Sequence, residues 1–314
     1  MNLDKNRTGR PLVGIALLAY NYGRYIDEAI ESLKQQTFQD FEVFLMDDGS
    51  DDGETAEKLA KLEYDKISKK YLYKENRGNA KRRRDQYKKM ENKYILDMSG
   101  DDKLAPEFLE KCVNYLESHP GCGAVSTGIK EYLDEFTGEP YVEFYYDEKK
   151  MKMPEMLAEC HFLGSSLMRN EAVKQTDFSG GFVRYLDWDK WISMLEAGWA
   201  LGTIREPLFM YRIHGDSLSH SSSAESETEV FKKIIEKHKK LYAENYQYVE
   251  SQLFHNMFAV TRNSDALVRS IEELKRANVA LAKENEALME DLRVSKMTFK
   301  NRVIGKLKKL LGQK

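Results

Sequence analysis

The sequence has few cysteines, no long apolar run and almost no net charge. Its three cysteines, Cys112, Cys122 and Cys160, form no CxxC pair, which favours a reducing cytoplasm. No apolar run approaches the roughly 18 residues typical of a membrane span, and no apolar signal segment precedes the first predicted strand. A net charge of −3 over 314 residues gives no field that would select nucleic acid. We therefore expect a cytoplasmic protein that could meet a membrane only at its surface.

The common phosphate-binding motifs are also missing. The sequence has no GxGxxG after its first apolar run and no glycine-rich loop that ends in GK[ST]. Neither a dinucleotide-binding fold nor a P-loop is therefore predicted. A phosphate ligand would have to be neutralised by a metal ion and by basic residues such as those in NRGNAKRRR, at 76–84.

Short apolar runs alternate with segments of helical periodicity along the chain. This alternation predicts parallel strands joined by right-handed crossovers, so we expect an α/β fold with an open, mostly parallel sheet and helices on both faces. Ligands of such sheets bind at the carboxyl ends of the strands. The predicted strands lie within 11–20, 41–53, 70–74, 93–98, 122–128, 161–169 and 201–214, and the predicted helices include 25–36, 54–67, 79–92, 106–119, 153–160 and 186–198.

Acidic side chains gather where these strands end. The first strand ends at Tyr20, the second at Asp47 and Asp48, and the fourth is followed by Asp101 and Asp102. Parallel strands end at one edge of a sheet, so these residues are expected to line one crevice. Asp102 alone could cap the next helix, and adjacent acids in an extended segment point apart, which disfavours an acid/base pair. A Mg²⁺ or Mn²⁺ site shared with substrate phosphates accounts for the convergence of acids.

Five segments follow one another at ordinary intervals between about residues 11 and 220. They are AYNYGRYIDEAIESLKQQTFQDFEVFLMDDGSDDGET, NRGNAKRRR, YILDMSGDDKLAPEFLEKCV, GSSLMR and LDWDKWISMLEAGWALGTIREPLFMYRIHGDSLS. Together they resemble the inverting, metal-dependent nucleotide-sugar glycosyltransferases of family 2, which have the GT-A fold and include bacterial polysaccharide synthases. The resemblance implies a GT-A domain over residues 1–220.

The resemblance also implies which residues hold the sugar donor. Tyr20 and Asp48 would bind the nucleoside, and Asp48 would accept a hydrogen bond from the base. This favours a UDP- or dTDP-sugar, and we predict UDP. Arg83 would lie near the base or the phosphates, and Asp101 would contact the ribose. Arg212 is a candidate for the leaving diphosphate.

The metal site that the resemblance implies consists of Asp102, assisted by His214, with Mn²⁺ or Mg²⁺ as the cofactor. His214 could instead be a surface histidine after a strand. The family motif has a further acid two positions before Asp101, and this chain has Ser99 there. The metal site is therefore short of one possible ligand.

The general base that the resemblance implies is Asp187, in LDWDKWISML. The family motif at this place is an acidic pair, and its first acid is replaced here by Leu186. Asp189 is the second choice for the base, and capping of the helix that follows is the structural alternative. A single acid near the acceptor hydroxyl is enough for an inverting displacement.

From residue 221 onward almost every segment is predicted to be helical, as a connector (221–265), a coiled coil (266–295) and a basic amphipathic helix (296–314). The coiled coil predicts a homodimer, and a long helix folded back on the catalytic domain is the alternative. The last helix has seven Lys or Arg and no acid, which is typical of binding to an anionic membrane surface or else of a partner-binding tail. The heptad positions are Leu267, Ile271, Leu274, Asn278, Leu281, Asn285, Leu288 and Leu292.

The sequence thus predicts a glycosyltransferase that uses a UDP-sugar and a glycan or lipid-linked acceptor on the inner face of the cell membrane, without nucleic acid as a partner. An alternative is a coiled-coil scaffold that binds a nucleotide sugar without turnover, which the replacements at Ser99 and Leu186 favour. A nucleotidyltransferase is disfavoured because its phosphate-binding loop is absent.

Overall fold

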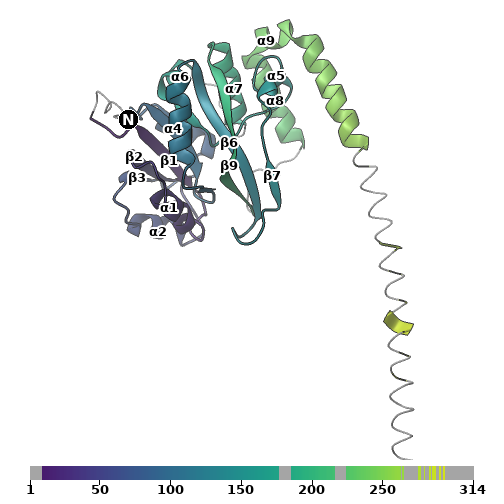
Figure 1. The fold of residues 1–314 in the computed structure, drawn as a ribbon, viewed down its shortest axis with the longest axis horizontal. Coiled ribbons are helices and arrows are strands. Elements are labelled where there is room, and N and C mark those ends of the chain that lie inside the picture. The colour runs from purple at the N-terminus through teal and green to yellow at the C-terminus, as the bar shows by residue number, and fades with distance from the viewer. Residues whose placement is uncertain are drawn as a thin grey trace, which may run out of the picture. The chain divides into compact units, whose positions relative to one another are not determined.

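Within the residues that the structure describes, nine strands form one sheet (Figure 1). The computed structural model describes residues 9–176, 185–215 and 224–262, together with isolated positions between 264 and 293. The chain divides into two units, Met1–Glu250 and Ser251–Lys314. The sheet belongs to the first unit.

The first part of the chain alternates strand and helix in the order β1 (Val13–Ala19), α1 (Ile26–Lys34), β2 (Phe41–Asp47), α2 (Thr55–Lys61), β3 (Ile67–Leu72), α3 (Asn79–Tyr87) and β4 (Tyr94–Ser99). β1 pairs in parallel with β2 on one side and with β4 on the other, and β2 pairs in parallel with β3. The predicted α/β fold with a mostly parallel sheet is therefore confirmed.

The second part adds β5 (Lys103–Leu104), α4 (Phe108–Ser118), β6 (Cys122–Leu133), β7 (Val142–Phe144), the 3₁₀ turn η1 (Glu148–Lys150), α5 (Glu155–Ala158), β8 (Leu167–Arg169), α6 (Asn170–Gln175), α7 (Leu186–Glu196) and β9 (Ala200–Ile213). The strand order is β3-β2-β1-β4-β8-β6-β9-β5, and β7 pairs with β6. β8 is antiparallel to both β4 and β6, while β6 and β9 run parallel. Only the last three residues of the strand predicted within 161–169 are extended, so the residues before them form a loop.

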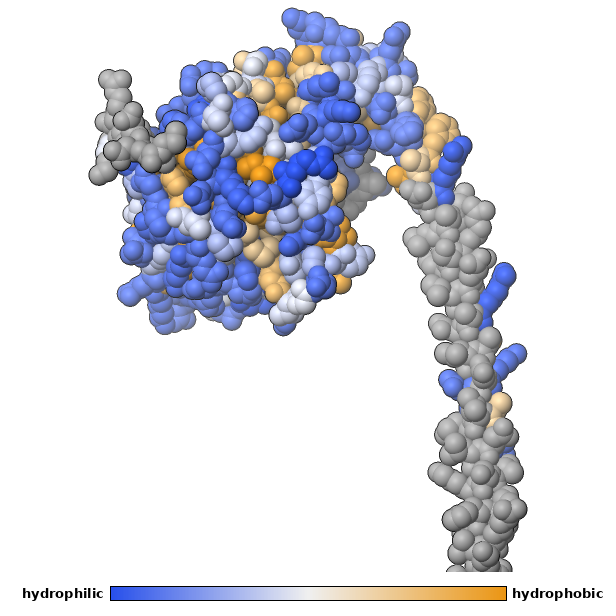
Figure 2. All heavy atoms as spheres, viewed as in Figure 1, coloured by the Kyte–Doolittle hydropathy of each residue, from blue (hydrophilic) through white to orange (hydrophobic). Residues whose placement is uncertain are grey.

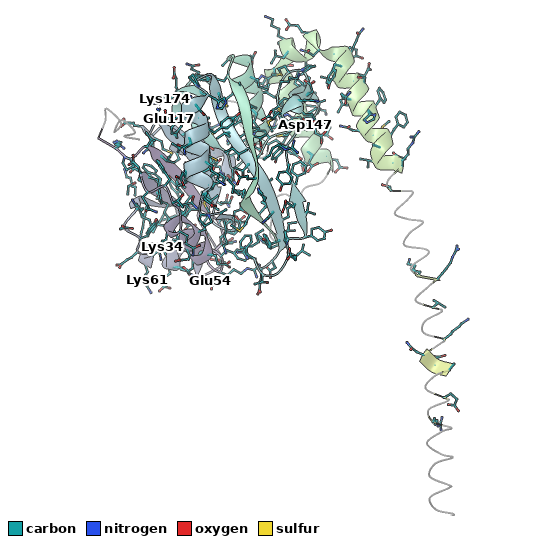
Figure 3. All side chains as sticks on the ribbon, viewed as in Figure 1. Lys34, Glu54, Lys61, Glu117, Asp147 and Lys174 are labelled. Carbon is teal, nitrogen blue, oxygen red and sulfur yellow. The ribbon has the colours of Figure 1, made fainter. Side chains whose placement is uncertain are left out.

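The sheet is covered on both faces, because alternate side chains of a strand point to opposite sides. Leu17 of β1 belongs to a core built with α1, α2 and α4. Its neighbour Leu18 belongs to a second core built with α3, α6 and α7. This two-sided burial explains why β1 is a continuous apolar run rather than an alternating one. Charged side chains such as Lys34, Lys61 and Lys174 lie on the outside of the fold (Figure 3).

Helices α8 (Ala224–Lys237) and α9 (Lys239–Glu244) belong to the first unit. Ile234 and Tyr242 from these helices are buried in the core that contains α7. Residues 246–262 are also helical. The predicted coiled coil at 266–295 lies mostly outside the described residues, and the basic helix at 296–314 lies entirely outside them. Among the residues that were described, no helix is both long and apolar enough to cross a membrane.

Candidate active site

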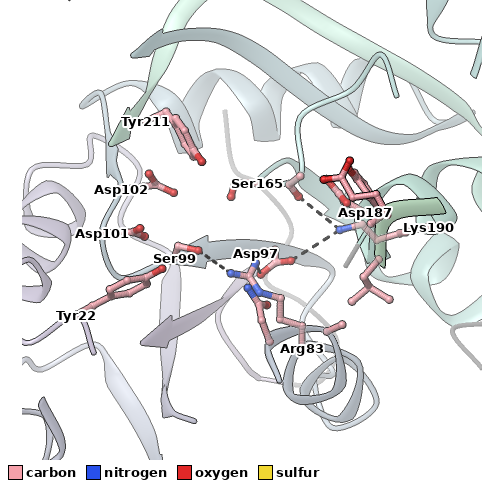
Figure 4. A pocket seen from close by; sticks show the side chains of 16 residues that line it. Tyr22, Arg83, Asp97, Ser99, Asp101, Asp102, Ser165, Asp187, Lys190 and Tyr211 are labelled. Atoms are coloured by element: carbon pink, nitrogen blue, oxygen red, sulfur yellow. Dashed lines mark hydrogen bonds and ion pairs between the residues drawn. The ribbon is translucent and has the colours of Figure 1, made fainter. Parts of the chain in front are cut away.

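A cavity of about 330 Å³ opens beside the carboxyl end of β4 (Figure 4). Its walls come from segments far apart in the sequence: the turn after β1, helix α3, β4 with the turn after it, the loop before β8, the start of α7, β9 and α8. The lining residues are Tyr22, Asn79, Ala80, Arg83, Asp97, Ser99, Asp101, Asp102, Gly164, Ser165, Tyr185, Leu186, Asp187, Lys190, Tyr211 and Glu227.

Asp101 and Asp102 lie in the cavity wall and are both buried. The tight turn that carries them is fixed by the amide of Gly100, which donates to the carbonyl of Leu18 in β1 at 2.8 Å. Burial, followed by the charge of Asp101, raises the pKa of Asp102 well above its usual value. Burial and the same two carboxylates also raise the pKa of Tyr22, whose side chain lies beside Asp101 (Figure 4). The site therefore places two acidic groups side by side where water has little access.

Arg212 and His214 contact this acidic pair but do not line the cavity. The backbone amide of Arg212 donates to Asp102 Oδ1 at 3.2 Å, and its Nε donates to the carbonyl of Asp101 at 2.8 Å. Its guanidinium lies between the rings of Tyr25 and Phe136, 4.2 and 4.1 Å from their centroids. His214 Nε2 lies 3.1 Å from Asp101 Oδ2. The roles predicted for these two residues, toward the diphosphate and the metal, stay predictions.

The floor of the cavity is a buried cluster of opposite charges. Arg83 donates to Asp97 through Nη1 and to the hydroxyl of Ser99 through Nη2, the latter at 2.8 Å. Lys190, from α7, places its Nζ 3.9 Å from Asp97 Oδ2 and 4.2 Å from the centroid of the Trp191 ring. Burial lowers the pKa of Lys190, although Asp97 and then Asp187 oppose this effect. Neither Asp97 nor Lys190 was predicted from the sequence. The signal for Asp97 was its position two residues before Ser99, on the same face of β4.

Asp187 lies in the cavity wall, whereas Asp189 does not. Gly164 makes room for the Asp187 carboxylate, since a Cβ at that glycine would lie 3.0 Å from Asp187 Oδ2. Asp189 is fully buried and accepts hydrogen bonds from helix α8 and the turn after it. Its partners are Lys237 Nζ at 2.8 Å and His238 Nε2 at 2.9 Å. The geometry therefore offers Asp187, and not Asp189, to a ligand in the cavity.

Tyr20 and Asp48, predicted to bind the nucleoside, are not among the lining residues of this cavity. The Asp48 carboxylate is buried and accepts from Arg82 Nε at 2.5 Å and from the amide of Arg77 at 3.0 Å. The Tyr20 hydroxyl donates to Asp51 at 3.2 Å. Arg82, rather than the adjacent Arg83, is thus the basic residue beside Asp48. The nucleoside role of Tyr20 and Asp48 stays a prediction.

The acidic pair fits a divalent cation in part. Among the described residues, no group of three His, Cys, Asp or Glu side chains is placed to hold a metal ion. The buried Asp101 Oδ1 has no hydrogen-bond partner among the residues that the structure describes. Asp102 is a desolvated acid with the charge of Asp101 beside it. Mg²⁺ commonly binds through one or two carboxylates together with substrate phosphates. The donor set therefore suits a cation that arrives with a diphosphate.

Two solved structures have a similar fold. Residues 1–349 of TarS from S. aureus, in complex with UDP, match with a TM-score of 0.55 at 19% identity, over 71% of this chain and 64% of that one. The mannosyltransferase PcManGT from Pyrobaculum calidifontis, in complex with GDP-Man and Mn²⁺, matches with a TM-score of 0.54 at 15% identity, over 80% of this chain and 75% of that one. These likenesses show that the fold is of the GT-A type.

Relatives in sequence point to the same group of proteins. An uncharacterized glycosyltransferase of Rickettsia bellii is 35% identical over 131 residues, which is 42% of this chain and only 19% of that protein. The uncharacterized glycosyltransferase MJ1057 of Methanocaldococcus jannaschii is 27% identical over 211 residues, or 65% of this chain and 71% of that one. The model of glycosyl transferase family 2 matches residues 15–177, which are 163 of the 314 residues. The chain belongs to glycosyl transferase family 2.

Proposed function

We propose that this chain transfers a sugar from a nucleoside diphosphate, most readily UDP, to a hydroxyl group, with inversion at the anomeric carbon. The observation that carries the proposal is the meeting of Asp102, after β4, and Asp187, in α7, in the walls of one cavity. Membership of family 2 supports a glycosyl transfer. The complexes of TarS with UDP and of PcManGT with GDP-Man support a nucleotide-linked donor.

Asp187 acts as the general base in this proposal. It takes the proton of the acceptor hydroxyl while the hydroxyl oxygen forms a bond to the anomeric carbon. The bond from that carbon to the diphosphate oxygen breaks, and its electron pair leaves with the diphosphate. Because the oxygen attacks from the face opposite the leaving group, the configuration inverts. Gly164 keeps the Asp187 carboxylate unobstructed on one side, and Lys190 interacts with it electrostatically.

Asp102 is proposed to hold a Mn²⁺ or Mg²⁺ ion together with the oxygens of the donor diphosphate. The complex of PcManGT with Mn²⁺ supports such a cofactor. When bound, the cation supplies positive charge that stabilises the departing diphosphate. Arg212 and His214 keep the turn of Asp101 and Asp102 in place through the contacts described above. Two adjacent acids supply too few ligands to hold a metal ion tightly on their own. They suit an ion that binds tightly only together with the nucleotide.

Two variants test these roles separately. Asp187→Asn is expected to lower the rate of UDP release from a UDP-sugar at least 100-fold, with UDP affinity in Mn²⁺ unchanged within threefold. Asp102→Asn is expected to have a different primary effect: it should weaken the Mn²⁺-dependent binding of UDP. A panel of UDP-, GDP- and dTDP-sugars, with and without Mn²⁺, identifies the donor. Loss of UDP binding by Asp187→Asn would contradict its role as the base.

A second candidate is a nucleotide-sugar-binding scaffold without turnover. Ser99 and Leu186, both in the cavity wall, stand where the family motifs have acids. The same panel distinguishes the two candidates, because a scaffold would bind a nucleotide with Mn²⁺ and release no UDP from any donor.

The acceptor and the location are proposed from the sequence of the C-terminal segment. Seven basic residues and no acid between 296 and 314 would favour an anionic membrane surface, which suits a glycan or lipid-linked acceptor. Sedimentation of the full chain with anionic vesicles is expected to fall as salt rises. Equal sedimentation of a chain that ends at residue 295 would contradict this location.

A further inference from the structure

Strand β7 carries exposed apolar side chains at the edge of the sheet. Val142 is 38% exposed and Phe144 is 44% exposed, and in the described part of the chain β7 pairs with β6 alone. An apolar area lies on the side of the domain where Figure 1 has β7 (Figure 2). Contiguous exposed apolar side chains mark interaction sites, whereas isolated ones are normal on a protein surface. No residue of β6 or β7 was predicted from the sequence to bind a ligand.

This apolar surface continues one wall of the candidate active site. Tyr211 of β9 lines the cavity. It is paired with Glu131 of β6, which is paired in turn with Val142 of β7. Paired residues of neighbouring strands point to the same face of a sheet, and so do residues two apart in one strand. The cavity face of β9 therefore runs across β6 to the edge of the sheet. We call four residues of this face the β7 shelf: Tyr211, Glu131, Val142 and Phe144.

The inner end of the shelf lies close to Asp187, the proposed base. The ring of Tyr146, two residues after Phe144, meets the Phe144 ring edge to face, with 4.9 Å between the centroids. Burial raises the pKa of Tyr146, and the charges of Asp187 and Glu131 add to this effect. Tyr146 therefore lies within electrostatic reach of both the base and the acid of the shelf. A molecule bound on the shelf is thus held beside the base.

The shelf combines aromatic, apolar and acidic groups in a way that suits a sugar ring. The C–H bonds of a sugar ring carry partial positive charge and pack against the negative face of an aromatic ring such as that of Phe144. The half-buried Glu131 lies between Tyr211 and Val142, and its carboxylate oxygens can accept hydrogen bonds from sugar hydroxyl groups. An acyl chain would cover that carboxylate without giving it a partner, at a cost in free energy. The chemistry of the shelf therefore favours a saccharide.

Addition of a strand from another protein is disfavoured at β7. The strand has three residues, and Pro140 lies two positions before it. Short edge strands and prolines at an edge both limit pairing with another chain. The side chains of β7, rather than its backbone, are therefore the groups offered to a ligand.

The size of the cavity places most of the acceptor outside it. The cavity of about 330 Å³ lies at the lower end of the range for small-molecule sites, about 300–1,000 Å³. A nucleotide sugar leaves little of this space for the acceptor, which must extend over the adjoining surface. The shelf is such a surface, since it shares Tyr211 with the cavity.

We propose that the β7 shelf binds the saccharide part of the acceptor, with Phe144 stacked on a sugar ring and Glu131 accepting hydrogen bonds from its hydroxyl groups. The next sugar unit then presents its hydroxyl to Asp187. Adjacent strands lie about 4.8 Å apart, so the row from Tyr211 to Val142 is about 10 Å long, enough for more than one sugar ring. This inference rests on the proposed function, because Asp187 is the base only there.

An array of printed neutral and acidic oligosaccharides tests the shelf, with the labelled full chain in UDP and Mn²⁺. The wild type is expected to bind at least one of them. Phe144→Ala removes a stacking contact and Glu131→Gln a charge-assisted hydrogen bond, so each is expected to weaken this binding about tenfold, with UDP affinity unchanged. Tyr145→Ala is the matched control and should bind as the wild type does. Its ring lies on the opposite face, where a Cβ at Gly128 would lie 2.8 Å from Tyr145 Cδ1.

Transfer to the bound oligosaccharide separates the shelf from the chemistry, and thermal unfolding verifies that the variants fold. Phe144→Ala is expected to raise KM for the oligosaccharide about tenfold, with KM for the donor unchanged. A wild type that releases UDP but binds no oligosaccharide would overturn the inference and leave the proposed function standing, as would equal effects of Phe144→Ala and Tyr145→Ala. Shelf-dependent binding without UDP release from any donor would contradict the proposed function alone. Association of two chains that Phe144→Ala abolishes, measured by light scattering, would make the shelf a protein interface and overturn the inference.

Discussion

Replacing Asp189 with asparagine tests how the two aspartates of α7 differ. Asp189 is fully buried, and its carboxylate joins α7 to Lys237 and His238. His238 also contacts Glu196 through Nδ1 at 3.1 Å, so the ring links two acids of one helix. An asparagine keeps the shape of the side chain and can still accept from His238, but it loses the charge. We expect the packing of α8 on the domain to weaken without any direct effect on the cavity.

The size of the effect follows from the burial of the partners. Lys237 is 16% exposed and can turn to water, and His238 keeps its contact with Glu196. The main loss is therefore one charge-assisted hydrogen bond, about 2 kcal/mol. For a unit of this length that lowers Tm by about 4–8 °C. Removing both partners, in Lys237→Ala with His238→Ala, leaves a buried carboxylate unpaired, at a cost of about 3–5 kcal/mol, and is expected to lower Tm by more.

Thermal unfolding and UDP release, measured on the same samples, complete the test. Asp189→Asn should lower Tm and keep most of the activity below the transition. Asp187→Asn should keep Tm and lose the activity. If Asp189→Asn left Tm unchanged and abolished turnover, Asp189 would be the base, and the assignment of the buried network to stability would be wrong.

Three further substitutions probe the walls and floor of the cavity. Gly164→Ala brings a Cβ to 3.0 Å from Asp187 Oδ2, so we expect kcat to fall about tenfold with UDP affinity unchanged in a binding titration. Asp97→Asn leaves the buried cations Arg83 and Lys190 short of a counter-charge; we expect a loss of about 3–5 kcal/mol in urea unfolding. Because burial lowers the pKa of Lys190, the unfolded chain binds more protons than the folded one between that pKa and about 10.4, and folding stability should rise with pH there. Unfolding measured from pH 8 to 10 should show that this rise is smaller in Lys190→Met.

The sequence predicted the parallel half of the sheet because each of its strands is long enough to show a pattern. β1 and β4 are buried on both faces, so they are continuous apolar runs that end in polar residues. Topology then brings the ends of the strands to one edge, which is why Asp101 and Asp102 could be placed in a crevice. Asp187 could not be placed in this way, since it lies on a helix; its position in the cavity was implied by the resemblance alone.

The antiparallel part could not be predicted from periodicity. β8 has three residues and β5 has two, which is too few for an alternation to be recognised. The loop that carries Gly164 and Ser165 into the cavity was consequently taken as part of a strand. The contacts of Arg212 were missed for another reason. Its stacking on Tyr25 and Phe136 joins three segments, and such contacts depend on side-chain direction, which spacing along the chain does not encode.

The replacement of a family acid by Ser99 has a structural counterpart two residues earlier. Asp97 and Ser99 point to the same face of β4, and both contact Arg83. The chain therefore keeps an acid on this face of the strand, two residues before the position of the family acid. Since a strand rises about 3.3 Å per residue, this acid is about 6.6 Å farther from Asp101 along the strand. There it neutralises Arg83 and approaches Lys190 at 3.9 Å. The wall near Asp102 is left with two adjacent carboxylates. Under the proposed function, the charge of a cation there would be balanced in part by the diphosphate of the donor, and this is why we expect nucleotide and cation to bind together.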